Sequence, residues 1–243
     1  MRPTNMLHKK KILIIGGSSG IGLGIASVCA DYGADTIIAG RCKQKLSNAT
    51  AFLDNRITGV QIDANNDNCI DAVYQQIGCF DHLVISAGEA MVKSLQETTE
   101  EDARGDMERN FWLKYKLSTR ALPYLSKEGS ILFISGIFSV KPNANLFMSS
   151  VSVGAVEALC KSLAISAAPI RVNAIAPYVV DNSDSLTKDI SDDRKNYLQS
   201  IASKIPAGNV GKTRDVGLAA VMLMKNQYAS GTILNLDGAY SLT

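Results

Sequence analysis

Short apolar segments alternate with helical patterns along almost the whole chain, and this alternation limits the possible folds more than any other feature. Segments with strand character are residues 11–15, 36–39, 60–62, 82–86, 130–135, 171–175 and 232–236. Apolar residues recur at helical spacing within residues 20–32, 68–77, 100–124, 151–167 and 214–224. Apolar strands that are separated by helices predict a parallel sheet covered on both faces.

The chain of 243 residues is long enough for one large unit of this kind, and no repeat or low-complexity linker divides it. We therefore predict an α/β fold with a doubly wound parallel sheet (Rossmann-type), as a single domain over residues 1–243. Residues 183–206 interrupt the alternation with a run of charges. This insertion is predicted to form a small lid over the ligand crevice, with a pair of surface helices as the alternative.

Composition argues against several classes of function. A net charge of +2 does not indicate binding to nucleic acid or to an anionic membrane, and no segment reaches the ~18 apolar residues of a membrane span. The five cysteines include no C-x-x-C pair, which favours a reducing, cytoplasmic location over a disulfide framework. Only His8 and His82 are histidines, so no histidine-based metal site is expected, and His82 is predicted to be structural.

The strongest local signal is the glycine-rich run at residues 16–22, between the first strand and the first helix. Glycines permit a tight turn and a close approach of the backbone to a pyrophosphate, and the helix N-terminus offers free N–H groups to that anion. A plain glycine turn is the alternative. The residues expected to bind this part of a dinucleotide are Gly16, Ser18, Ser19, Gly20, Ile21 and Gly22.

The end of the second strand indicates which dinucleotide binds. An acidic residue at this position binds the ribose hydroxyls of NAD, whereas an arginine accommodates the 2′-phosphate of NADP. This chain has Arg41 and no carboxylate there, with Lys43 and Lys45 close by. A guanidinium binds a phosphate through two hydrogen bonds, so the sequence favours NADP(H) as the cofactor. The alternative is that Arg41 is only a surface charge.

The glycine run is similar to the T-G-x-x-x-G-I-G fingerprint of the short-chain dehydrogenase/reductase family, with Ile15 in place of the usual Thr. The resemblance continues along almost the whole chain, in the family's order. It is carried by residues 85–88 (family N-N-A-G), Asn110, residues 170–177 (family I-R-V-N-x-x-x-P-G) and residues 234–238 (family L-N-V-D-G). The resemblance implies further cofactor contacts from Asp63, Ala64, Ala87, Gly88 and Pro177.

The resemblance also locates the family's catalytic positions. Members use a Tyr to transfer a proton and a Lys four residues later, which lowers the pKa of that Tyr and holds the nicotinamide ribose; a Ser and an Asn assist them. Residues 129–136 resemble G-S-I-V-N-I-S-S, and residues 149–159 resemble Y-S-A-S-K-A-A-V-E-A-L. Gly136, Ser149 and Val153 then stand where the family has Ser, Tyr and Lys, and the sequence contains no Tyr-x-x-x-Lys.

These replacements predict a severe loss of ordinary carbonyl reduction. A serine hydroxyl is a far weaker acid than a phenol, and general acid–base catalysis contributes about 10²–10⁴-fold. An activated substrate, such as an iminium ion or a conjugated acceptor, accepts hydride with little proton help. The candidate catalytic residues are Asn110, Ser135, Ser149 and Tyr178. The alternative roles are support of a helix kink for Asn110 and filling of space for Tyr178.

The leading function is an NADP(H)-dependent oxidoreductase with a non-standard active site that acts on a small organic substrate. The alternatives are a non-redox enzyme on the same scaffold and an NADP-binding sensor or partner subunit. Neither nucleic acid nor a membrane is an expected partner. Residues 151–167 are apolar or small around much of the helix, and family members pair through it, so we expect a homodimer or homotetramer; burial within one subunit is the alternative.

Overall fold

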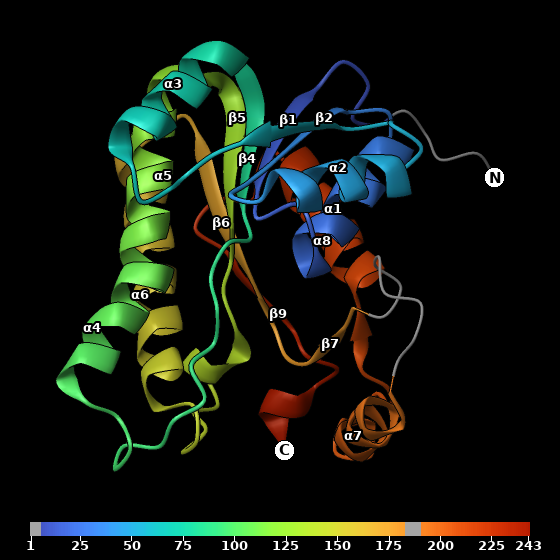
Figure 1. Ribbon diagram of the computed structural model, residues 1–243, viewed down its shortest axis with the longest axis vertical. Coiled ribbons are helices and arrows are strands. Elements are labelled where there is room, and N and C mark those ends of the chain that lie inside the picture. Colours follow the sequence, from blue (N-terminus) through green and yellow to red (C-terminus); the bar gives the residue numbers. More distant parts are fainter. Residues whose placement is uncertain (1–5, 183–190) are drawn as a thin grey trace.

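A computed structural model of the chain describes residues 6–182 and 191–243 (Figure 1). In these residues, seven strands form one sheet in the order β3-β2-β1-β4-β5-β6-β9, and every neighbouring pair is parallel. The strands are β1 (Lys11–Ile15), β2 (Asp35–Gly40), β3 (Thr58–Gln61), β4 (Phe80–Ile85), β5 (Leu125–Ile134), β6 (Arg171–Pro177) and β9 (Ile233–Leu236). The predicted doubly wound parallel sheet is confirmed.

Helices cover both faces of the sheet, which explains why its strands are apolar throughout. In β1, Ile12 and Ile14 point into one buried cluster, whereas Leu13 and Ile15 point into the other. This alternation follows from the two-residue period of a strand. A strand with both faces buried must be apolar at every position, and that is the pattern that the sequence shows.

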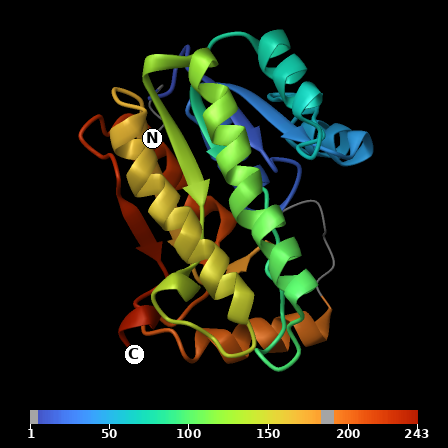
Figure 2. The ribbon, with the colours of Figure 1, turned by 90° about the vertical axis from the view of Figure 1, so that its left-hand side faces the viewer.

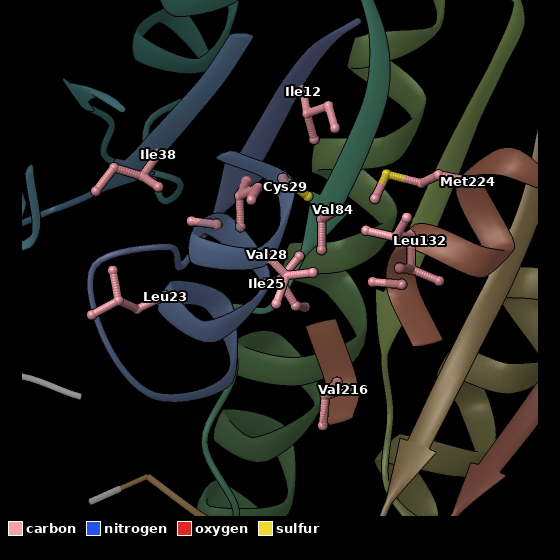
Figure 3. Close-up of a cluster of buried hydrophobic side chains, with 14 of the residues drawn as sticks. Ile12, Leu23, Ile25, Val28, Cys29, Ile38, Val84, Leu132, Val216 and Met224 are labelled. Atoms are coloured by element: carbon pink, nitrogen blue, oxygen red, sulfur yellow. The ribbon is translucent and has the colours of Figure 1, made fainter. Parts of the chain in front are cut away.

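The first face is covered by α1 (Gly20–Asp31), α2 (Lys43–Phe52) and α8 (Thr213–Lys225) (Figure 1). Figure 3 shows how side chains of α1 and α8 meet those of the central strands in this cluster, with Val28, Val84 and Leu132 among them. The helix α2 was not predicted. Its N-terminal half is charged, and Leu46 and Ala49 are its buried residues, so its sequence carries little apolar periodicity.

The second face is covered by α3 (Asp67–Ile77), α5 (Leu113–Ala121) and α6 (Phe147–Ser166), and α5 and α6 lie side by side (Figure 2). The single helix expected over residues 100–124 is divided into α4 (Glu100–Met107), a π-helical turn η1 (Glu108–Trp112), α5 and a 3₁₀ turn η2 (Leu122–Tyr124). The helix expected from residue 151 begins four residues earlier, at Phe147.

The apolar character of helix α6 is explained by its packing within the domain. It has 20 residues and is long and apolar enough, by length and composition alone, to cross a membrane. In the structure its residues Val156, Cys160 and Leu163 pack on the sheet, and it also buries the polar side chains of Ser152 and Glu157. We therefore assign α6 to the helical layer of the domain.

Shorter elements lie beyond the carboxyl ends of the strands. They are η3 (Ile137–Ser139), the paired strands β7 (Val180–Asp181) and β8 (Gly211–Lys212), α7 (Asp192–Ala202) and η4 (Tyr240–Leu242). Of the predicted lid, residues 183–190 lie outside the described residues. The described part consists mainly of α7, which buries Leu198 and Ile201 against the domain. The role of residues 183–206 as a lid stays a prediction.

The strand order fixes the position of a ligand crevice. From β1 the chain proceeds outward to β2 and β3, then returns to the centre and continues through β4, β5, β6 and β9 on the other side. The connections that leave β1 and β4 therefore diverge at the carboxyl ends of these neighbouring strands. In doubly wound sheets ligands bind at this point, and the glycine-rich turn follows β1 directly.

The buried His82 on β4 generates a prediction of pH-dependent stability. Its Nδ1 lies 2.8 Å from Ser130 Oγ, and desolvation by burial lowers its pKa to about 4. Between pH 6.5 and pH 4 the unfolded chain binds a proton that the folded chain excludes, so this residue lowers stability as the pH falls. From these pKa values, wild type should lose about 2 kcal/mol of unfolding free energy between pH 7.5 and pH 5 because of His82.

Urea unfolding at both pH values measures this loss. His82→Asn should remove the His82 contribution to the pH dependence, whereas His8→Gln, at an exposed histidine, should keep the wild-type slope. If His82→Asn and wild type lose the same free energy between the two pH values, the structural assignment of His82 is wrong.

Candidate active site

A cleft of about 730 Å³ opens at the carboxyl ends of the strands and collects most of the predicted site residues. Residues that line it include all four candidate catalytic residues, Asn110, Ser135, Ser149 and Tyr178. It is also lined by Gly16, Ser18, Ser19, Gly20, Ile21, Arg41, Ala64, Ala87, Gly88 and Pro177. Gly22 and Asp63 lie outside the lining.

The turn after β1 forms the narrow floor of the cleft. Gly16 has a φ of +82°, and a Cβ at this position would lie 2.6 Å from the backbone nitrogen of Ala87. Neither the conformation nor the space admits a side chain, so glycine is required where the turn meets the loop after β4. Gly22 supports the turn from beneath, because a Cβ there would collide with the carbonyl oxygen of Gly16.

The first turn of α1 faces the cleft with unpaired donors. The helix begins at Gly20, and the side chain of its N-cap residue Ser19 forms no capping hydrogen bond. No acidic residue lies in the first turn. The free N–H groups and the positive end of the helix dipole are therefore available to an anion, and the cradle fits a phosphate group.

Basic side chains border the far end of the cleft. Arg41 and Lys45 are exposed and line it beside Ile62 and Ala64. The loop that bears Arg41 is held by Gln61, whose Nε2 donates to Arg41 O at 2.9 Å. Asp63 shapes the neighbouring loop instead of lining the cleft, because its Oδ1 accepts a hydrogen bond from Asn65 N at 3.0 Å.

Asn110 lies in the π-helical turn η1 and fixes the loop after β4. Its Oδ1 accepts from Glu89 N, and its Nδ2 donates to Glu89 O, both at 3.1 Å. Nδ2 also donates to Asp106 Oδ1 at 3.2 Å. Single π turns within α-helices are frequent at functional sites, and this one turns Asn110 toward the cleft. Asn110 therefore lies both in the π-helical turn and in the lining of the candidate site, the two locations that its alternative roles require.

The two predicted catalytic serines are both engaged by the protein. Ser149 Oγ accepts a hydrogen bond from Met91 N at 2.8 Å and donates to Met91 O at 3.2 Å. Ser135 Oγ lies 3.0 Å from Glu157 Oε1, which also accepts from Ser139 Oγ at 2.7 Å. In this arrangement Ser149 fastens the loop after β4 to α6, and Ser135 fastens the end of β5 to α6.

Between these serines the cleft wall is apolar. Gly136 follows β5, and a Cβ on it would lie 3.6 Å from Val153 Cγ1 on α6. The two residues therefore face each other directly across the wall. Neither carries a group that can donate a proton or hold a charge, so this part of the cleft provides shape alone.

Tyr178 belongs to an aromatic group at the mouth of the cleft. Its ring stacks on Tyr240 at 3.8 Å between centroids, and Phe138 meets it edge-on at 6.2 Å. Lys141 Nζ lies 4.1 Å from the centroid of the Tyr240 ring. Desolvation and the neighbouring Tyr240 raise the pKa of Tyr178 above its ordinary value, which makes its phenol a weaker acid. Its catalytic role stays a prediction.

Sequence reasoning missed three residues of this region: Lys114, Glu157 and Tyr240. Lys114 lines the cleft, and Glu157 binds both Ser135 and Ser139. The spacing from Asn110 to Lys114 places both residues on one helix face and was a usable signal. Nothing in the sequence indicates that the C-terminal Tyr240 reaches Tyr178, because the two are far apart in the chain.

The crevice and its glycine-lined turn place the chain among the doubly wound α/β proteins that bind ligands at the point where the strand order reverses. Comparison with known proteins narrows this class. The family described as Enoyl-(Acyl carrier protein) reductase matches residues 16–241. A protein from Acremonium sp, named Short-chain dehydrogenase/reductase ucsE, is 28% identical, with 98% of this chain and 97% of that protein covered.

Two solved structures are similar over nearly the full chain. The MalC Reductase/Diels-Alderase from Malbranchea aurantiaca has a TM-score of 0.88 at 25% identity, covering 98% of this chain and 99% of that one. A small-chain dehydrogenase in complex with NADPH has a TM-score of 0.80 at 27% identity, covering 97% and 100%. The chain belongs to the short-chain dehydrogenase/reductase family that this match and these relatives define.

The contacts of Ser149 generate a prediction of stability. Ser149→Ala removes both hydrogen bonds to Met91 and leaves its backbone groups without these partners, so unfolding free energy should fall by about 1–3 kcal/mol. Ser150→Ala is the matched control: in the described part of the chain, Ser150 Oγ bonds only the carbonyl of Leu146, the N-cap residue of the same helix. It should change stability by less than about 0.5 kcal/mol. Urea unfolding measures both. Equal stability of the two variants would contradict a fastening role for Ser149.

Proposed function

We propose that this chain is an NADP(H)-dependent oxidoreductase with a non-standard active site, acting on a small organic substrate that is already electrophilic. The observation that carries the proposal is the contrast between the two ends of one cleft. At one end lie a glycine cradle, an open helix N-terminus and basic residues. At the other end, Gly136 and Val153 form an apolar wall without an acid or a cation.

The fit of the cleft to a dinucleotide supports the cofactor assignment. Gly16 and Gly20 adopt positive φ values, and no atom of the described residues lies within 4 Å of the position of a Cβ on Gly20, so the turn leaves open space beside the helix N-terminus. Arg41 and Lys45 offer cations for a 2′-phosphate. The family relative solved with NADPH is consistent with this choice. When bound, NADPH supplies a hydride.

The protein's own groups suit a reaction that needs little proton transfer. In our proposal, Gly136, Ser149 and Val153 occupy the positions of the family's Ser, Tyr and Lys. Ser149 holds the loop after β4 in place, and Asn110 holds the same loop from the opposite helix. These contacts fix the loop that borders the cleft, and a fixed wall favours a defined orientation of the substrate. An iminium ion or conjugated acceptor meets these requirements, whereas a ketone needs an acid that the wall lacks.

A non-redox reaction on the same scaffold is a second candidate. The absence of an acid and a cation on the Gly136–Val153 wall would favour a cyclisation or isomerisation, in which the cleft supplies mainly shape. The similarity to the MalC Reductase/Diels-Alderase supports this alternative. A sensor or partner subunit would need the cradle alone. The redox proposal requires that a substrate consume NADPH. The non-redox enzyme and the sensor or partner subunit do not.

Homo-oligomer formation and a cytoplasmic location remain proposals. Trp112 and Tyr115 expose more than two fifths of their surface on the helix layer that also bears α6, and Val151 does the same on α6 itself. Apolar side chains exposed on adjacent helices are consistent with a partner subunit.

The choice of cofactor predicts the behaviour of Arg41. Wild type should bind NADPH more tightly than NADH in a fluorescence titration. Arg41→Asp removes charge-assisted hydrogen bonds to the 2′-phosphate and adds a repelling carboxylate, so NADPH affinity should fall about 10–100-fold while NADH affinity changes little. Lys43→Asp, an equal charge change at an exposed residue outside the cleft lining, should have a much smaller effect. If wild type binds neither nucleotide, the proposed function fails.

A further inference from the structure

The cleft contains a buried lysine that the proposed chemistry has not used. Lys114 lies on α5, and its side chain is 4% exposed. Its Nζ donates to Ala87 O at 2.8 Å, in the loop that follows β4. A Cβ on Gly88 would lie 2.9 Å from this Nζ and 2.6 Å from Asn110 Oδ1. The ammonium group therefore lies beside the glycine-lined floor, next to Asn110.

This ammonium group has few partners in the protein. An ammonium has three N–H donors, and Ala87 O is its one hydrogen-bond acceptor in the described part of the chain. Asp106 supplies the nearby negative charge; its Oδ1 accepts from Asn110, and its buried Oδ2 has no hydrogen-bond partner among the residues that the structure describes. Burying a charge with so little compensation costs folding free energy, and a bound anion would offset this cost. Desolvation accordingly lowers the pKa of Lys114 to about 8, against the opposing effect of Asp106.

The charged groups around Lys114 leave the cleft side of its ammonium group open to an anion. Asp106, on α4 and bonded to Asn110, is not among the residues that line the cleft. Arg109 on η1 and Glu89 after β4 also line the cleft, one of each sign. The residues of the opposite helix α6 that line the cleft are uncharged: Ser149, Ser152, Val153 and Val156. Among the described residues, Lys114 is therefore the one cation that is buried in this part of the cleft.

We propose that Lys114 donates a hydrogen bond from its ammonium group to a ribose or phosphate oxygen of the bound dinucleotide, and so supplies from α5 the cation that α6 lacks at Val153. This inference rests on the proposed function, since it requires that the cleft bind NADP(H). Lys114 and Val153 line the same cleft from its two flanking helices. A cation on either helix faces the ligand between them.

The proposal makes NADPH binding depend on pH in a defined direction. The free protein loses the Lys114 proton around pH 8. A bound anion favours the charged form and raises this pKa, so binding takes up a proton when the pH is above 8. NADPH affinity should be constant between pH 7 and pH 7.5 and should fall above pH 8, by at most about ten-fold per pH unit for a single proton.

The experiment measures the dissociation constant of NADPH by isothermal titration calorimetry between pH 7 and pH 9.5, in buffers of different ionisation enthalpy. Lys114→Met should weaken binding at pH 7 by about ten-fold or more and abolish the pH dependence. Lys116→Met, two residues along the same helix and outside the cleft, should bind within about two-fold of wild type and keep the pH dependence. Adding Val153→Lys to Lys114→Met should recover affinity.

The outcomes separate the two proposals. If wild type binds NADPH, and Lys114→Met has the same affinity and the same pH dependence of binding, the role of Lys114 is wrong. The proposed function is then unaffected. No binding by wild type overturns the proposed function itself. If Lys114→Met fails to fold by its thermal transition, the wild type decides alone: uptake of close to one proton at pH 9 and none at pH 7 supports the role, and equal uptake at both values refutes it.

Discussion

The close approach of two backbone segments at the centre of the sheet determines the rest of this molecule. The turn after β1 and the loop after β4 meet where Gly16 leaves no room for a side chain against Ala87. They meet there because the strand order reverses between β1 and β4, so these two parallel neighbours send their connections to opposite faces of the sheet. The gap between the diverging connections is the cleft, and the N-terminus of α1 lies at its edge.

The loop after β4 is held from both helices that flank the cleft. Asn110 on η1 binds the backbone of Glu89, Lys114 on α5 binds the carbonyl of Ala87, and Ser149 on α6 binds the backbone of Met91. Three polar side chains thus fasten one short loop at successive points. In our proposal, Ser149 and Asn110 stand at catalytic positions of the family, and in this structure both side chains bind the backbone of that loop. We therefore propose that these side chains maintain the shape of the cleft for cofactor binding and do not supply acid–base chemistry.

The sequence was informative where the physical signal is local. Strands buried on both faces are apolar throughout, so the sheet was predictable, and the glycine turn stood out because a positive φ and a close contact exclude other residues. The helix α2 was missed because few of its side chains are buried. The contacts of Ser135 with Glu157 and of Tyr178 with Tyr240 depend on tertiary packing. The position of Lys114 beside Gly88 depends in addition on the π-helical turn that precedes it, which no local pattern predicted.

In our proposal, the cleft delivers hydride to an electrophile without an acid from the protein. The most direct measurement follows deuterium from NADPH labelled at both C4 positions into a small cyclic iminium ion and into the ketone of the same shape, with the Ser149→Tyr, Val153→Lys double variant alongside. The account predicts label in the amine and none in the alcohol for wild type, with alcohol appearing only in the double variant. Label in the alcohol at a comparable rate from wild type, or label in neither product, would contradict it.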